Sequence, residues 1–168
     1  MAIKLTFNPT YDEILEVVKG CFNSAEKVQW LNINQPFPAP NSIALSKFMD
    51  QSLGAQRLSA VAREIEEGTP VGYIFCGSFF PPTMNSVPHM GFGINMDLQG
   101  RGYGVELLNK FIEEFKQRQI SNQLFGHCLE RNAGARRTME KVGMVGRNLG
   151  VQPYTNGNAS MEYVIRFD

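Results

Sequence analysis

The chain has 168 residues, 43% of them apolar, which suffices for one buried core and predicts a single domain over residues 1–168. Sixteen basic side chains balance sixteen acidic ones, so the sequence lacks the global basic field that draws proteins onto nucleic acid or anionic membranes, and neither is expected as a partner. The three cysteines are widely spaced and odd in number, which favours reduced thiols in a cytoplasmic protein over a disulfide framework or a metal site.

The amino-terminal segment is predicted to form a helix and not a signal peptide. Its carboxylates, at Asp12, Glu13 and Glu16, interrupt the apolar stretch that a signal peptide needs. Thr10 and Glu13 have the spacing of a capping box, so we expect a helix over 10–22. Its buried face is expected to be Ile14, Val17, Val18 and Cys21. After a proline-rich segment at 35–41, Ser42 can cap a second helix.

Strands are predicted from Arg57 onward. The stretches 57–65 and 71–79 flank a turn containing Gly68 and Pro70, which indicates an antiparallel hairpin, and the second stretch is expected to be central because both of its faces are apolar. A third strand is expected over 89–96. The helix that follows it is expected to bury a stripe formed by Val105, Leu108, Ile112 and Phe115.

The last third of the chain continues this alternation. We expect a strand over 122–130, a helix over 133–142 that ends at Gly143, and a late pair of strands in which Tyr163 faces the core. The order of elements predicts an α/β sandwich with a mixed sheet. The strands 89–96 and 122–130, joined by the long helix, are expected to form a right-handed parallel crossover.

Three glycines, Gly100, Gly102 and Gly104, lie where the strand 89–96 leads into the long helix. Glycine weakens a helix by about 1 kcal/mol relative to alanine, so this cluster needs a reason. The first turn of a helix carries N–H groups without partners and a partial positive charge, and glycine lets that backbone approach an anion and adopt positive φ. The turn is therefore predicted to bind phosphate.

Two common phosphate-binding loops do not fit this turn. A Walker loop ends in Gly-Lys-Ser/Thr, whereas Val105 and Glu106 follow Gly104, and the dinucleotide pattern would need glycine at Val105. The stretch Gln99-Gly100-Arg101-Gly102-Tyr103-Gly104 instead resembles the Q/R-x-x-G-x-G/A turn of the GNAT acetyltransferase superfamily. The block from Asn132 to Met144 resembles that family's N-x-x-S/A followed by E-K-x-G-F. The resemblance covers about 57–168 and is strongest to the ribosomal-protein N-acetyltransferase branch.

The resemblance implies a GNAT-type α/β fold: a mixed, mostly antiparallel sheet with a central splayed pair of parallel strands and helices on both faces. It implies that an acetyl group passes from acetyl-coenzyme A to a primary amine by direct attack in a ternary complex. The implied cofactor-binding residues are Ile94, Met96, Gln99, Gly100, Arg101, Gly102, Tyr103, Gly104, Asn132 and Arg137.

Several of these residues have a second interpretation. Ile94 and Met96 would act through their main chain. Asn132 would hydrogen-bond the pantetheine arm, cap the next helix, or do both. Arg101, Arg136 and Arg137 could approach phosphates, although exposed arginines are often simply solvated.

The residues that transfer protons are expected to be His89 and Tyr154. Aligning Gly91 and Phe92 with the family's Gly-Tyr places His89 where several relatives carry a glutamate that faces the acceptor; His127 and Glu130 are the alternatives. The tyrosine that many relatives use as general acid has no counterpart between Asn132 and Met144, so Tyr154, in a loop expected over 147–158, is the candidate acid.

The acceptor is expected to be an α-amine of a peptide, protein or amino acid, or another small amine. The segments expected to line its site, 35–41, 80–88 and 147–158, carry little charge, which disfavours a strongly cationic acceptor. The missing tyrosine leaves a second function open, that of a non-catalytic module that holds acyl-coenzyme A for regulation. A monomer or a homodimer is expected.

Overall fold

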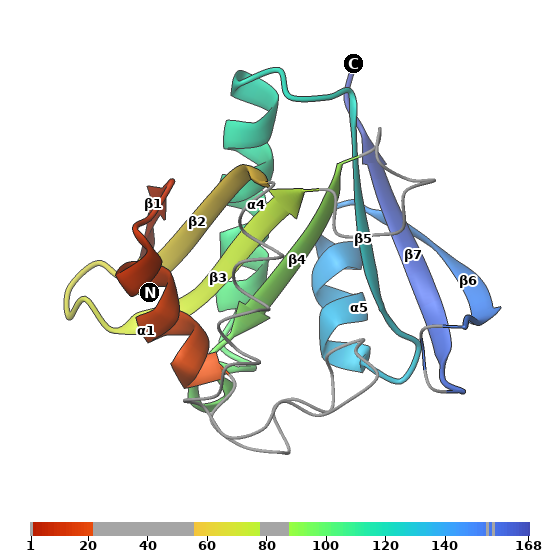
Figure 1. Ribbon diagram of the computed structural model, residues 1–168, viewed down its shortest axis with the longest axis horizontal. Coiled ribbons are helices and arrows are strands. Elements are labelled where there is room, and N and C mark those ends of the chain that lie inside the picture. The colour runs from red at the N-terminus through yellow and green to blue at the C-terminus, as the bar shows by residue number, and fades with distance from the viewer. Residues whose placement is uncertain (1, 22–55, 78–87, 154, 156) are drawn as a thin grey trace.

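The protein folds around one seven-stranded sheet (Figure 1). The structure, a computed structural model, describes residues 2–21, 56–77, 88–153, 155 and 157–168. The strands lie in the order β1-β2-β3-β4-β5-β7-β6. Their bounds are β1 Ile3–Phe7, β2 Gln56–Glu64, β3 Pro70–Gly77, β4 His89–Ile94, β5 Gln123–Leu129, β6 Val145–Val151 and β7 Ala159–Arg166. All neighbouring strands are antiparallel except β4 and β5, which confirms the predicted mixed sheet with one parallel pair.

Helices cover both faces of this sheet. The helix α1, Tyr11–Cys21, buries Val17 and Val18 against Tyr73 and Phe75 of β3. On the other face lie α4, Tyr103–Gln117, and α5, Ala133–Lys141. A short 3-10 helix, η2, Met96–Leu98, connects β4 to the glycine turn. The three predicted α-helices that fall in the described residues are thus confirmed, and those predicted over 10–22 and 133–142 agree within one residue at each end.

The start of α1 has the capping box that the sequence predicts. The backbone N–H of Thr10 donates to Oε2 of Glu13 at 2.8 Å, and the backbone N–H of Glu13 donates to Oγ1 of Thr10 at 3.3 Å. Two N–H groups that the helix itself cannot satisfy therefore gain partners.

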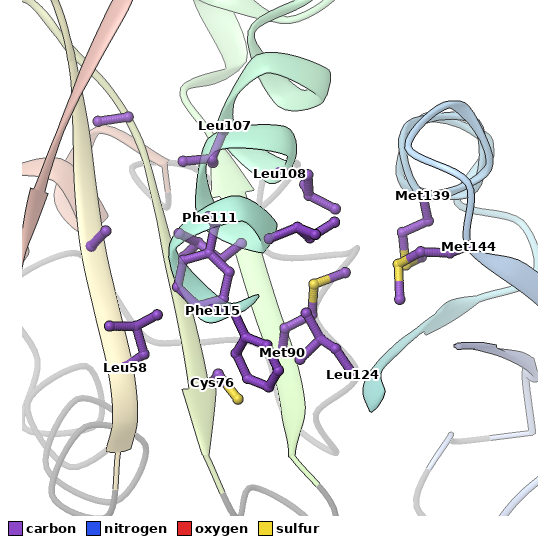
Figure 2. Close-up of a cluster of buried hydrophobic side chains, with 14 of the residues drawn as sticks. Leu58, Cys76, Met90, Leu107, Leu108, Phe111, Phe115, Leu124, Met139 and Met144 are labelled. Carbon is purple, nitrogen blue, oxygen red and sulfur yellow. The ribbon is translucent and has the colours of Figure 1, made fainter. Parts of the chain in front are cut away.

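The main core lies between α4 and the sheet, and it is broader than the predicted stripe. Val105 is only partly buried, whereas Leu107 and Phe111 are buried together with Leu108, Ile112 and Phe115. Figure 2 shows Leu107, Leu108, Phe111 and Phe115 of α4 in one cluster with Met90 of β4. A helix that crosses the middle of a sheet contacts it over a wide arc, so two neighbouring rows of apolar residues are buried.

Four sequence expectations need correction. The strand β1 was not predicted, although Ile3, Leu5 and Phe7 alternate with polar residues. The strand expected over 89–96 ends at Ile94, because the chain turns into η2. Residues 145–151 form β6, so much of the loop expected over 147–158 is a strand. Glu162 is buried as well as its neighbour Tyr163, although only Tyr163 was expected to face the core.

The segments 35–41, the helix expected after Ser42 and nearly all of 80–88 lie outside the described residues.

Candidate active site

The sheet opens between β4 and β5. These parallel strands pair only at His89–Phe125 and Met90–Gly126, although β4 continues to Ile94 and β5 to Leu129. Figure 1 shows the two strands close together at one end and apart at the other. The far half of β4 therefore has a sheet neighbour on one edge only.

The backbone of β4 that faces this opening can be identified from its ladder with β3. The N–H of Asn95 donates to the carbonyl of Val71 at 2.7 Å. Backbone groups alternate between the two edges of a strand, so those of Phe92 and Ile94 point away from β3 and toward β5. They lie beyond the last residue of β4 that pairs with β5. These main-chain groups are placed to bind an extended ligand that runs along the strand, which is the role that the sequence assigned to Ile94.

The glycine turn adjoins the open end of β4. Gly100 has φ 79° and Gly102 has φ 88°, conformations that residues with a side chain rarely adopt. A Cβ added to either glycine would meet no atom within 4 Å, so both face open space. Gly102 is the N-cap of α4, whose first turn directs its N–H groups and the positive end of its dipole toward the same space. The turn thus forms a cradle for phosphate oxygens.

Gly104 and Tyr103 have structural roles in the same turn. A Cβ on Gly104 would lie 3.1 Å from Cγ2 of Thr138, so this glycine lets α4 approach α5 closely. The ring of Tyr103 is buried in the core, and its hydroxyl donates to a carboxylate oxygen of Glu64. Tyr103 can therefore contribute only its backbone to a bound phosphate.

Gln99 and Met96 stabilise the end of β4. The side-chain amide of Gln99 donates to the carbonyl of Ile94 at 3.2 Å, and its backbone N–H donates to the carbonyl of Met96 at 3.2 Å. The main chain of Met96 belongs to η2 and not to the strand, so its carbonyl is already engaged where the sequence analysis expected it to bind the pantetheine arm. The carbonyl of Ile94 is engaged as well, so the N–H of Ile94 and the backbone of Phe92 are the better-placed groups.

The remaining predicted cofactor residues lie on loops and exposed helix faces. Asn132 is the N-cap of α5, and its Oδ1 accepts from the N–H of Ala135 at 3.1 Å, which confirms the capping interpretation. Arg101 and Arg137 are both exposed. Arg136 donates through Nη1 to the carbonyl of Glu130 at 3.1 Å, so this arginine braces the turn before α5.

Two histidines and a carboxylate meet in the sheet where β4 and β5 still touch. Nδ1 of His89 lies 3.3 Å from Nδ1 of His127 on β5, and Nε2 of His127 lies 3.2 Å from Oε2 of Glu162 on β7. Arg147 on β6 donates through Nε to Oε1 of Glu162 at 2.7 Å. His89 is 3% exposed and Glu162 is 6% exposed, so this cluster is buried up to the side chain of Arg147. Sequence reasoning singled out His89 and His127 but missed Glu162 and Arg147.

Burial controls the charge of these histidines. It lowers the pKa of His89 to about 4, with a further contribution from His127, while Glu162 opposes the shift. Burial also lowers the pKa of His127, and the carboxylate of Glu162 partly offsets that effect. Both imidazoles are therefore neutral near pH 7.

The other candidates for acid or base chemistry have contacts or surroundings of their own. Tyr163 is fully buried and its hydroxyl donates to Oε1 of Glu140 at 2.9 Å, which confirms a core role. Glu130 accepts from the side-chain amide of Asn148 at 2.7 Å. Burial raises the pKa of Cys128 to about 12, so its thiol is inert. Tyr154, the expected general acid, lies outside the described residues.

Within the described ranges, no group of three or more His, Cys, Asp or Glu side chains could hold a metal ion. None of the helices in the described part of the chain is long and apolar enough to cross a membrane.

Comparison with known proteins agrees with this geometry. The family model for the acetyltransferase (GNAT) domain matches residues 5–145. No curated protein gives a significant match to the sequence.

Solved structures of acetyltransferases share the fold. A GNAT-family acetyltransferase from Bacillus anthracis is 20% identical, with a TM-score of 0.73 over 99% of this chain and 98% of that one. An aminoglycoside acetyltransferase in complex with coenzyme A is 16% identical, with a TM-score of 0.71 over 97% and 95%. Ribosomal-protein-S5-alanine acetyltransferase from Vibrio fischeri is 14% identical, with a TM-score of 0.69 over 100% and 94%, so the ribosomal-protein branch is one neighbour among several.

The cradle at Gly100 and Gly102 and the open backbone of β4 fit the phosphates and the extended arm of coenzyme A. With this fit and a family model that spans most of its length, the chain belongs to the acetyltransferase (GNAT) domain family and is an N-acetyltransferase that uses acetyl-coenzyme A.

Proposed function

We propose that this enzyme transfers acetyl to the primary amine of a peptide, protein or amino acid, or to another small amine, by direct attack in a ternary complex. The observation that carries the proposal is the cradle at Gly100 and Gly102, which follows directly on the unpaired end of β4. Phosphates held at the start of α4 leave the pantetheine arm to extend along β4 toward His89. The thioester would then lie near the point where β4 and β5 meet.

Backbone groups of β4 would stabilise the reaction. A carbonyl that is attacked by an amine gains negative charge on its oxygen, and a fixed N–H donor stabilises that charge. The N–H groups of Phe92 and Ile94 face the opening and suit this task.

His89 would accept the proton that the amine loses, directly or through one water. An α-amine has a reference pKa near 7.7–8.0, so most of it is protonated at neutral pH. His89 is neutral at this pH, which is the protonation state that a base needs. Tyr154 would supply the proton that the departing thiolate needs.

The charged groups near His89 indicate the class of amine that the enzyme accepts. The carboxylate that acts on His89 is that of Glu162, and it is already bound to His127 and Arg147. A polycationic acceptor would favour a cleft lined with carboxylates. We further propose a cytoplasmic location, because three buried free cysteines suit a reducing compartment.

The direct test is release of free thiol from acetyl-coenzyme A in the presence of a panel of amines. The panel contains peptides with a free amino terminus, the same peptides with that terminus blocked, free amino acids, a polyamine and an aminoglycoside. We expect release with the unblocked peptides or the amino acids. Release with the polyamine or the aminoglycoside alone would contradict the acceptor class.

A second candidate function is a non-catalytic module that binds acyl-coenzyme A. The observation that favours it is the low pKa of His89, which makes this imidazole a weak base when it acts alone. Calorimetry that detects tight binding of acetyl-coenzyme A, together with no thiol release for any amine, would identify this module.

A further inference from the structure

The amino-terminal strand β1 is the first strand of the sheet, and one of its edges faces away from β2. The N–H of Ile65 donates to the carbonyl of Ala2. The N–H of Asn8 donates to the carbonyl of Ser59. Backbone groups alternate between the two edges of a strand, so those of Ile3 point away from β2. Among the described residues, no further strand pairs with β1 on that side.

Two side chains of α4 bind the backbone of Ile3 in place of a strand. Oε1 of Glu106 accepts from the N–H of Ile3 at 2.9 Å, and Nζ of Lys110 donates to the carbonyl of Ile3 at 2.6 Å. Nζ of Lys110 also forms an ion pair with Oε1 of Glu106 at 3.3 Å. We call these three contacts the Ile3 clamp. The side chain of Ile3 is buried in the same core as the apolar face of α4, so this residue contacts the helix through its backbone and its side chain.

The Ile3 clamp lies close to the glycine turn. Glu106 belongs to the first turn of α4, four residues after Gly102, which corresponds to about 6 Å along the helix axis. Tyr103, the residue after Gly102, donates from its hydroxyl to Glu64. Glu64 in turn pairs with Ile3 in the ladder between β1 and β2. The first turn of α4 is therefore connected to β1 directly and also through β2.

The charge of Glu106 is unfavourable for phosphate binding at this turn. A carboxylate one turn from a bound phosphate repels it, and it also interacts with the positive end of the helix dipole that the phosphate would use. The ion pair with Lys110 offsets part of this charge. The favourable contribution that Glu106 can make is its hydrogen bond to Ile3, which orients the first turn of α4.

We propose that Glu106 and Lys110 are positioning residues for coenzyme A: by binding Ile3, they fix the first turn of α4 against β1 and hold its N–H groups in the orientation that binds phosphate. A preorganised turn loses less conformational freedom when a ligand binds, so the affinity depends on the Ile3 clamp. The coupling is reciprocal, so coenzyme A bound at the turn stabilises the contact of β1 with α4. This coupling involves the cofactor site alone and is independent of which amine accepts the acetyl group.

Substitutions at Glu106 separate its hydrogen bond from its charge. Glu106→Gln and Glu106→Met both remove the carboxylate and introduce a good helix former, but only glutamine keeps an oxygen that can accept from the N–H of Ile3. We expect Glu106→Gln to retain wild-type affinity for coenzyme A or exceed it, since a repulsive charge is lost. We expect Glu106→Met to bind coenzyme A about 10-fold more weakly, because the first turn is no longer held. Isothermal titration calorimetry measures both affinities.

Glu114→Met is the matched control for Glu106→Met. Glu114 pairs with Arg118 at the same spacing on the same helix, and in both pairs the basic side chain is 40% exposed and the acidic one 27% exposed. The Glu114 pair lies at the other end of α4, away from the glycine turn. We expect Glu114→Met to bind coenzyme A with wild-type affinity.

Hydrogen exchange tests the reciprocal effect in the wild-type protein and needs no substitution. The N–H of Ile3 is bound by a side chain at the edge of the sheet, so it exchanges when the Ile3 clamp opens locally. The amides of β6, at the opposite edge of the sheet, are the reference. We expect saturating coenzyme A to slow exchange at Ile3 at least about 5-fold more than it slows exchange in β6. Two-dimensional NMR of 15N-labelled protein measures both rates.

Three results would overturn the role of the Ile3 clamp. The first is equal affinity of Glu106→Gln and Glu106→Met for coenzyme A. The second is a loss of affinity in Glu114→Met as large as that in Glu106→Met, because general weakening of α4 would then be the cause. The third is exchange at Ile3 that coenzyme A slows no more than exchange in β6, and it decides the question even if Glu106→Met does not fold.

Failure of the proposed function gives a different result. If no amine causes thiol release but coenzyme A binds with the affinities expected for the Glu106 variants, the proposed acetyl transfer is contradicted and the Ile3 clamp is supported. If the wild type does not bind coenzyme A, the cradle at Gly100 and Gly102 and the role of the Ile3 clamp are both overturned.

Discussion

Strand β4 meets its two neighbours in different ways. Toward β3 it pairs along its whole length, from Gly77–His89 to Gly72–Ile94, whereas toward β5 it pairs at His89 and Met90 alone. Beside the paired edge, rings of β3 cover the glycines of β4: a Cβ on Gly91 would lie 2.5 Å from the ring of Phe75, and one on Gly93 would lie 2.5 Å from that of Tyr73. The splayed edge leaves backbone groups for a ligand. One strand thus anchors the core and presents the site, and the two tasks can be tested separately.

Disrupting the cradle at the splayed end should have the largest effect. Gly102→Glu puts a negative charge where the phosphate is expected, and it gives a residue with a side chain the unfavourable φ of 88°. We expect the affinity for acetyl-coenzyme A to fall about 100-fold or more. Calorimetry measures the loss. Gly68→Glu is the matched control, because Gly68 also has positive φ, 70°, and also faces open space, but in the turn between β2 and β3. Equal affinities for the two variants would contradict the site.

Acid should destabilise the protein through the histidines at the point where β4 and β5 meet. His89 titrates near 6.5 in the unfolded chain and at about 4 in the fold, so the unfolded state binds more protons between these values. The stability that the neutral His89 contributes is fully present above pH 6.5. It is lost as the pH falls toward 4, and the free energy of unfolding decreases by roughly 3 kcal/mol. Urea unfolding of wild type and His89→Asn at pH 7 and pH 4.5 measures the difference. Parallel losses in the two proteins would show that His89 is not responsible.

Replacing a glycine by alanine on β4 and on β5 should lower the free energy of unfolding by different amounts. Gly93→Ala forces a methyl group against the rigid ring of Tyr73, and we expect a loss of about 1–3 kcal/mol. Gly126→Ala on β5 meets the flexible ends of Met139 and Met90, at 2.9 Å and 3.0 Å, which can move aside, so its loss should stay below about 1 kcal/mol. Urea unfolding of both variants at pH 7.5 tests the order, and a larger loss for Gly126→Ala would reverse the comparison.

A small effect is also expected at the cap of α5. Asn132→Ala removes an acceptor 3.1 Å from the N–H of Ala135 and should lower the free energy of unfolding by about 1 kcal/mol. Asn132→Ser can keep the cap and should restore stability. If Asn132 also hydrogen-bonds the pantetheine arm, acetyl-coenzyme A should bind to both variants about 1–2 kcal/mol more weakly. Wild-type affinity in Asn132→Ser would leave only the capping role.

Local signals account for the elements that the sequence predicted well. The capping box of α1, the spacing of its apolar face and the glycines before α4 each depend on residues within a few positions of one another. The same period-two pattern was present in β1 and was overlooked, so that strand was also within reach of sequence analysis. The sequence analysis expected Val105 to be buried, but it is only partly buried. Helical periodicity does not show how much of the helix surface the sheet will cover.

The sequence by itself determined the shape of the glycine turn, because positive φ at Gly100 and Gly102 and the start of α4 are properties of one short segment. It also determined the sheet class and the family. Only the tertiary structure decided that Ile94 and Phe92 face an opening, since this depends on where β4 stops pairing with β5. It also decided that His127 lies between His89 and Glu162, residues on three strands whose register is fixed by sheet pairing and not by any local pattern. Glu162 is buried for the same reason: it pairs across the sheet with His127, and an alternating strand read alone cannot reveal that partner.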